Sequence, residues 1–177
     1  MIEQCLKEET GITKTPSENS RAVMLFEQNE YAEAFALFKR LAAEAPSVQS
    51  LNNMAWIYLR EEENMDEADR VLQQVPAFQP QSSFPYMMLG EISLFKQRYD
   101  QAKSYLQKAL EFSGTEEATY NLAIAHYQLS EFKSAAEMFA RCVGDSGMTQ
   151  LHEVVAWMDA GEHDKAKALL DGWNEDA

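Results

Sequence analysis

The sequence is poor in the residues that interrupt regular secondary structure. Its 177 residues include 7 glycines and 5 prolines, whereas 46% are of apolar types. This balance argues against long loops, disorder and an all-β architecture, and it supplies enough apolar side chains for a continuous core. No run of 18 or more apolar residues occurs, so no membrane span is expected. The N-terminal segment also lacks the basic and apolar regions of a secretory signal peptide, and we expect a cytoplasmic protein.

Cysteine is also scarce. Cys5 and Cys142 are far apart in the sequence, and neither belongs to a CxxC pair. A small secreted domain held together by disulfides would contain more cysteines, in pairs. We therefore expect two free thiols, with Cys142 at a small core position on the inner face of a helix.

Basic residues are outnumbered by acidic ones. The sequence has 15 Lys and Arg against 29 Asp and Glu, which gives a net charge of −14. A surface of this charge repels phosphate backbones and anionic lipids, so neither a nucleic acid nor a membrane is expected as a partner. Two interpretations of the charge stay open: it keeps the protein soluble, or it attracts a protein or peptide partner with a basic flank.

Signatures of catalysis and of metal binding are absent from the sequence. The three histidines are His126, His152 and His163, and none belongs to an HxxxH or HExxH arrangement. No GxSxG, GxxxxGK(S/T) or GxGxxG motif occurs. We therefore expect no enzyme activity, no catalytic residue, no cofactor and no metal site, and we expect His126 to be a core imidazole.

What the sequence does contain is a motif that returns every 34 residues. A small residue, Ala34, is repeated at Ala68 and Ala102. Two further sets keep the same interval: Phe38, Leu72 and Leu106, and Pro46 and Pro80. A fourth copy follows after 33 residues, with Ala135 and Phe139 at the small and the large position.

The clearest copy spans residues 82–112. Its apolar residues recur at steps of three and four, which predicts two amphipathic helices joined by a tight turn. Gly90 in the first helix and Ala102 in the second are small, so we expect the two backbones to approach closely there, with Leu106 continuing the inward face. One hairpin of this size cannot bury its own apolar surface, and it needs neighbouring copies.

A 34-residue repeat with a small residue, a large apolar residue four positions later and a proline after the helix resembles the tetratricopeptide repeat family. The resemblance implies an all-α fold, a right-handed α-solenoid of about five helical hairpins. It covers a domain of residues 17–177, with repeats at about 17–46, 47–80, 82–113, 115–144 and 148–173. The fifth repeat is degraded, since Val154 occupies its small site, which is typical of a terminal repeat.

Residues 1–16 precede the first repeat and form an N-terminal arm or a capping helix. Ile2, Cys5 and Leu6 make a narrow apolar stripe in this segment. The arm caps the first repeat, lies in a groove or is disordered, and the sequence leaves these alternatives open.

Several polar residues stand at predicted helix ends. Ser47, Thr115 and Ser130 are expected N-caps, because their side chains can accept the hydrogen bonds of free N–H groups. Asn64 and Glu67 are expected to form a capping pair. The turn that ends at Asn64 is one residue longer than its counterparts.

In this family the first helix of each repeat lines the concave surface. Each first helix has its own small residue: Ala22, Ala55, Gly90 and Ala123. The positions three before it and one, four and five after it define a set that we call the groove residues. They are Asn19, Val23, Phe26, Asn52, Trp56, Leu59, Arg60, Met87, Glu91, Leu94, Phe95, Tyr120, Ile124 and Tyr127. Most are apolar or aromatic, and such a belt would exceed the exposed apolar area that monomers normally tolerate.

Some tetratricopeptide proteins use lysine, arginine and asparagine on their first helices to clamp the acidic C-terminus of a chaperone. Among the groove residues Arg60 is the one cation, and Glu91 would repel such a ligand. We therefore do not expect that activity.

The resemblance implies a non-catalytic interaction module. It would be an adaptor, scaffold or chaperone-like protein that holds an apolar or aromatic partner segment in the concave groove. Several alternatives stay open. Packing within the array buries the groove residues, the N-terminal arm occupies the groove, a second copy binds there to form a homo-oligomer, or the protein is a regulatory subunit of an enzyme complex.

Overall fold

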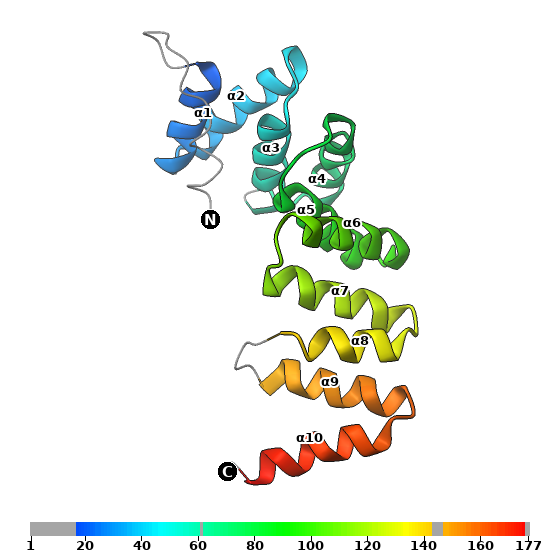
Figure 1. The fold of residues 1–177 in the computed structure, drawn as a ribbon. Helices are drawn as coiled ribbons and strands as arrows, with labels where there is room; N and C mark the ends of the chain where they lie inside the picture. The colour runs from blue at the N-terminus through cyan, green and yellow to red at the C-terminus, as the bar shows by residue number, and fades with distance from the viewer. Residues whose placement is uncertain (1–16, 61, 143–146, 176–177) are drawn as a thin grey trace. The chain divides into compact units, whose positions relative to one another are not determined.

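The computed structural model describes residues 17–60, 62–142 and 147–175 (Figure 1). Over these residues it contains ten α-helices, one short 3-10 helix and no β-strand. The elements are α1 (Glu18–Glu27), α2 (Tyr31–Glu44), α3 (Val48–Arg60), α4 (Met65–Leu72), η2 (Val75–Phe78), α5 (Ser83–Phe95), α6 (Tyr99–Phe112), α7 (Glu116–Gln128), α8 (Phe132–Phe139), α9 (Gly147–Asp159) and α10 (His163–Glu175). The predicted N-terminal arm at residues 1–16 lies outside the described residues.

The α-helices follow one another in five pairs, each joined by a short turn. The chain divides into two compact units between Val71 and Leu72, within α4, and each unit is described by itself. In the second unit α5 to α10 pack in chain order, with α7, α8, α9 and α10 as successive layers (Figure 1). The predicted all-α class is confirmed for the described residues. None of the described helices has the length and apolar character needed to cross a membrane.

The second unit contains a close approach of paired helices at Gly90 of α5. A Cβ placed on this residue would lie 2.5 Å from Cγ of Leu106 and 2.6 Å from its Cδ2. Leu106 and Ala102, on the inward face of α6, are fully buried. The predicted close contact is therefore confirmed, and glycine is needed because Leu106 fills the space that a side chain would take.

A residue in left-handed backbone conformation follows the first helix of each pair. These residues are Asn29 (φ 64°), Glu63 (φ 48°), Gln97 (φ 57°), Ser130 (φ 60°) and Gly161 (φ 77°). In four of the turns the next residue donates its N–H to the carbonyl five positions earlier, as Arg98 does to Ser93 at 2.8 Å. This is the Schellman arrangement, which satisfies carbonyls left open at a helix C-terminus.

The second of these turns differs because it is one residue longer. Asn64 donates its N–H to the carbonyl of Tyr58, six positions earlier, at 2.7 Å. The side-chain oxygen of Asn64 accepts the N–H of Glu67 at 3.2 Å, whereas the Glu67 carboxylate pairs with Arg70 at 2.6 Å. One half of the predicted capping pair is therefore present.

Two of the three predicted serine and threonine N-caps are confirmed. Ser47 accepts the N–H of Ser50 at 3.1 Å, and Thr115 accepts that of Ala118 at 3.3 Å. The prediction for Ser130 was wrong, because the N-cap position of α8 is Glu131. Ser130 supplies the left-handed residue that the turn requires one position before the cap.

Replacing Gly90 by alanine tests the helix contact. The methyl group gains about 1 kcal/mol of helix propensity, but it collides with Leu106, and overpacking of this kind costs about 1–3 kcal/mol. We expect Gly90→Ala to lower the free energy of unfolding by about 1 kcal/mol in urea titrations followed by circular dichroism. In a Leu106→Ala background the same change should stabilise the protein. Gly114→Ala is the control, since nothing lies within 4 Å of a Cβ there, and an equal loss for both variants would contradict the contact.

The left-handed backbone conformation of Ser130 predicts that glycine at this position stabilises the protein. A residue with a side chain pays roughly 1–2 kcal/mol in the left-handed region, and glycine does not. Glycine also gives the unfolded chain more freedom, so we expect Ser130→Gly to raise the free energy of unfolding by about 0.5 kcal/mol. Ser113→Gly is the matched control, because Ser113 is also exposed but has an extended φ of −157°. Thermal unfolding of both variants is the measurement, and a stabilised Ser113→Gly with an unstabilised Ser130→Gly would refute the assignment.

Candidate partner-binding surface

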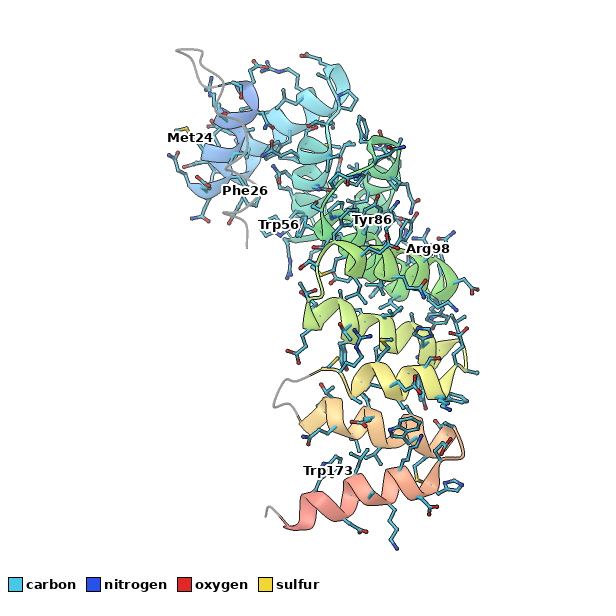
Figure 2. The ribbon with its side chains drawn as sticks, viewed as in Figure 1. Met24, Phe26, Trp56, Tyr86, Arg98 and Trp173 are labelled. Atoms are coloured by element: carbon cyan, nitrogen blue, oxygen red, sulfur yellow. The ribbon has the colours of Figure 1, made fainter. Side chains whose placement is uncertain are left out.

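Three aromatic side chains of the first unit form one cluster. The ring centroid of Trp56 on α3 lies 4.7 Å from that of Phe26 on α1 and 6.2 Å from that of Tyr31 on α2, while Phe26 and Tyr31 are 5.3 Å apart. All three rings are half-buried, and Figure 2 shows Phe26 and Trp56 beside each other. Leu59, half-buried, and Arg60, exposed, follow Trp56 by one helical turn. The groove residues Phe26 and Trp56 therefore form a single partly exposed aromatic patch.

The remaining groove residues of the first unit are more enclosed. Val23 is 9% exposed and Asn52 is 7% exposed. Asn19 is half-buried and donates from Nδ2 to the side-chain oxygen of Gln49, which ties α1 to α3. The Oδ1 atoms of Asn19 and Asn52 are buried and have no hydrogen-bond partner among the described residues. Because both oxygens are closed off from the surface, a ligand cannot reach them unless the surrounding side chains move.

In the second unit the groove residues of α5 lie against α7. Met87 is buried, and Glu91 accepts a hydrogen bond from Nδ2 of Asn121 at 3.3 Å. Leu94 packs on a buried cluster that α6 and α7 share. Phe95 is the exception, because its side chain is 72% exposed, the largest value for a large hydrophobic residue in the described ranges.

The groove residues of α7 lie against α9 in the same way. The hydroxyl of Tyr120 is 3.0 Å from Nδ1 of His152, and Tyr127 donates its hydroxyl to Asp159. Ile124 packs on a buried cluster that includes residues of α9. The hydrogen bond to Asp159 raises the pKa of Tyr127, and burial raises the pKa of Tyr120, so both hydroxyls stay protonated at neutral pH.

The same positions on α9 are exposed. Counted from Val154, they are Leu151, Val155 and Met158, with Met148 one turn earlier. Their exposed fractions are 44%, 38%, 49% and 59% in the order named. The groove prediction omits them because the degraded fifth repeat has valine where the other repeats have a small residue. Counting from that valine identifies three of the four, so the signal is present in the sequence.

Charge is divided unequally between the two helices of each pair in the second unit. The first helices, α5, α7 and α9, contain acidic residues and neither Lys nor Arg. The acidic residues are Glu91, Glu116, Glu117, Glu153 and Asp159. Five lysines lie on the second helices, Lys103, Lys108, Lys133, Lys165 and Lys167, and a sixth, Lys96, is the C-cap residue of α5. The first helices therefore produce a negative potential that favours a basic ligand.

A pocket of about 450 Å³ lies where α7 and α9 begin. Its lining includes Glu116, Glu117, Tyr120 and Thr149. Two carboxylates beside an aromatic ring suit the end of a Lys or Arg side chain. Within residues 17–60, 62–142 and 147–175, no group of three His, Cys, Asp or Glu side chains is arranged to hold a metal ion.

Two tetratricopeptide repeat families match the sequence, one over residues 25–90 and the other over residues 85–115. No curated protein matches the chain by sequence. Several solved structures share its fold at low identity. MamA AMB-1 has a TM-score of 0.76 at 20% identity, over 89% of this chain and 95% of that chain. MamA MSR-1 has a TM-score of 0.73 at 20% identity, over 89% and 93%.

A third similar structure is YrrB, described as a TPR protein with an unusual peptide-binding site. Its TM-score is 0.76 at 19% identity, over 87% of this chain and 81% of that chain. At such identities the likeness concerns the fold alone. It confirms the predicted fold class, an α-solenoid of tetratricopeptide hairpins.

Away from the groove residues, His126 belongs to a hydrogen-bonded network that joins three helices. Its Nδ1 lies 2.5 Å from Oε2 of Glu131, and Nζ of Lys103 lies 2.7 Å from Oε1 of the same carboxylate. His126 is 9% exposed, so the predicted core imidazole is buried and hydrogen-bonded. The hydrogen bonds from Lys103 and then from His126 lower the pKa of Glu131.

The lowered pKa of Glu131 predicts that its contribution to the free energy of unfolding depends on pH. The folded protein binds the Glu131 proton less readily than the unfolded chain, so the carboxylate stabilises the fold above the ordinary glutamate pKa of about 4.3. That stabilisation is lost as the pH falls through the lower folded-state value. Because the carboxylate is 40% exposed and screened by solvent, we expect Glu131→Gln to cost about 0.5–1 kcal/mol at pH 7 and progressively less below about pH 4. Urea titrations across this range, with exposed Glu137→Gln as the control, measure it, and a cost that does not shrink on acidification would contradict the network.

Proposed function

The chain belongs to the tetratricopeptide repeat family, and we propose that it is a non-catalytic adaptor, scaffold or chaperone-like protein that binds an apolar or aromatic segment of a partner. The ligand is a protein or peptide segment, and its basic flank is attracted by the acidic first helices. The activity is assigned to the cytoplasm. The domain of residues 17–177, its five repeats and the arm at residues 1–16 are part of the same proposal.

The exposure of Phe95 carries this proposal. Burying a phenylalanine side chain is worth about 1.5–3 kcal/mol, and Phe95 keeps most of its surface in water. It stands at the end of α5, on a helix whose other groove residues are partly or fully covered. A ring in this position supports a role as an anchor that a ligand covers.

The groove residues have distinct roles within each unit. In the first unit the patch of Phe26 and Trp56 supplies apolar contact, whereas Asn19 and Asn52 are more enclosed and Asn19 ties α1 to α3 through Gln49. Arg60 adds one cation at the rim. In the second unit Phe95 is the anchor, and the partly buried residues Leu94, Tyr120, Ile124 and Tyr127 offer further contact area.

The likeness to YrrB supports a peptide as the class of ligand, because that protein is described as having a peptide-binding site. The groove residues Val23 and Met87 are buried, so they offer little surface to a ligand. Affinity would come from the apolar contacts, less the cost of ordering the ligand.

Capture from an extract of the source cells tests the proposed surface. We expect Phe95→Ala to reduce the yield of co-purified partners at least about fivefold, because the largest exposed anchor is lost. Phe78→Ala is the matched control, since Phe78 is 43% exposed on η2 and outside the first helices. Trp56→Ala tests the first unit. Because Trp56 also packs on Phe26, the melting temperature of this variant is measured to verify that it stays folded. If Phe95→Ala and Trp56→Ala both recover the wild-type set of partners in wild-type yield, the placement of the binding surface is wrong.

A further inference from the structure

We propose that Met148, Leu151, Val155 and Met158, here called the end row, bind an amphipathic helix of a partner whose apolar face is flanked by Lys or Arg. This inference rests on the proposed interaction function, but it concerns residues outside the groove residues. The bound helix would pack on α9 as α9 packs on α7. The end row would thus be the docking site for a helix supplied in trans.

The positions that correspond to the end row on α5 and α7 pack against the next first helix. Apart from Phe95, the row on α5 is covered by α7, through the hydrogen bond from Asn121 to Glu91 and the packing of Leu94. The row on α7 is covered by α9, through the contacts of Tyr120 with His152 and of Tyr127 with Asp159. In both cases the covering element is a helix. The surface shape that this row presents is therefore complementary to a helix.

The end row itself is an exposed apolar stripe on α9. Its four side chains follow steps of three, four and three residues, so they form one stripe about 15 Å long. The opposite side of α9 is held in the core, where Val154, Ala156 and Trp157 are buried. The end row is thus presented by a fixed helix, and no described residue covers it to the extent that α9 covers the row on α7.

The first helices that carry or neighbour the end row are acidic. The first helices of the second unit carry five acidic residues and no Lys or Arg, and of the two on α9, Asp159 directly follows Met158, whereas Glu153 accepts a hydrogen bond from the buried Trp157 on the opposite side of the helix. A second copy of this chain would bring its own excess of acidic residues to the row, since the net charge is −14. A basic helix meets the opposite charge. Charge complementarity therefore favours a basic partner over self-association.

The pocket at the start of α7 and α9 supports the same ligand. Its lining includes Glu116, Glu117 and the ring of Tyr120, and Thr149 connects it to the end of α9 that carries Met148. A Lys or Arg side chain near one end of the bound helix fits this combination of carboxylates and aromatic ring. The apolar row and the acidic pocket then recognise two parts of one amphipathic helix.

The test uses two synthetic helical peptides of about 18 residues, or about 27 Å. The first has leucines at alternating steps of three and four with lysines beside them, and the second has glutamates in place of the lysines. Binding to the full chain is measured by fluorescence anisotropy at physiological salt. We expect the lysine peptide to bind at least about tenfold more tightly than the glutamate peptide.

Two substitutions by lysine test whether the peptide binds at the end row. Met158→Lys is expected to weaken binding of the lysine peptide at least about tenfold, because it removes apolar contact and adds repulsion. Met24→Lys is the matched control, since Met24 on α1 is also 49% exposed and the change in net charge is identical. It should change the affinity less than about twofold. Circular dichroism of both variants verifies that they fold.

Several outcomes would overturn the inference. These are equal binding of the two peptides, equal effects of the two variants, or no binding of either peptide. Sedimentation equilibrium supplies a further one: a dimer that Met158→Lys dissociates would mean that a second copy covers the row. Loss of lysine-peptide binding in Phe95→Ala but not in Met158→Lys would leave the proposed function intact and remove the end row from it.

Discussion

The structure depends on one packing constraint, the burial of a small residue in the second helix of every pair. The five residues concerned, Ala34, Ala68, Ala102, Ala135 and Ala166, are all fully buried. A larger side chain at these positions would separate the paired helices, as the space beside Gly90 illustrates. Because close pairing uses small residues, the large apolar residues are left to contact neighbouring pairs, and each pair is stable only within the array.

This constraint makes the stacking surface and the binding surface compete for the same side chains. Tyr120 and Tyr127 lie at groove positions, yet their hydroxyls bond to His152 and Asp159 on the next first helix. Each such bond contributes about 1 kcal/mol net, and its loss would leave a polar group unsatisfied. A ligand therefore gains more by covering side chains that stacking has not used, such as Phe95 and Met158, than by displacing those tyrosines.

The pairing of helices could be predicted from the sequence because it follows from periodicity. The 34-residue interval identified the buried alanines and the role of Gly90, which the contact with Leu106 confirms. The turn at Ser130 was predicted wrongly, because a serine before a helix is compatible both with an N-cap and with a left-handed residue, and only the backbone geometry separates these. Exposure within the groove residues could not be predicted either. Met87 and Phe95 occupy the same helix, and the packing of α7 on α5 decides which of them is buried.

The separation of charge between first and second helices would give the proposed binding surface its selectivity. Exposed charges act over a Debye length of about 8 Å at physiological salt, so Asp159, which is exposed and directly follows Met158, influences a ligand at the end row more than the lysines of the second helices do. Charges of this kind mainly increase the rate of encounter and exclude acidic ligands, whereas apolar burial supplies most of the affinity. A ligand with the apolar spacing alone would bind without discrimination, and one with basic charge alone would bind weakly and lose its affinity in salt. Only a ligand that combines both properties along one helix face satisfies what α9 presents.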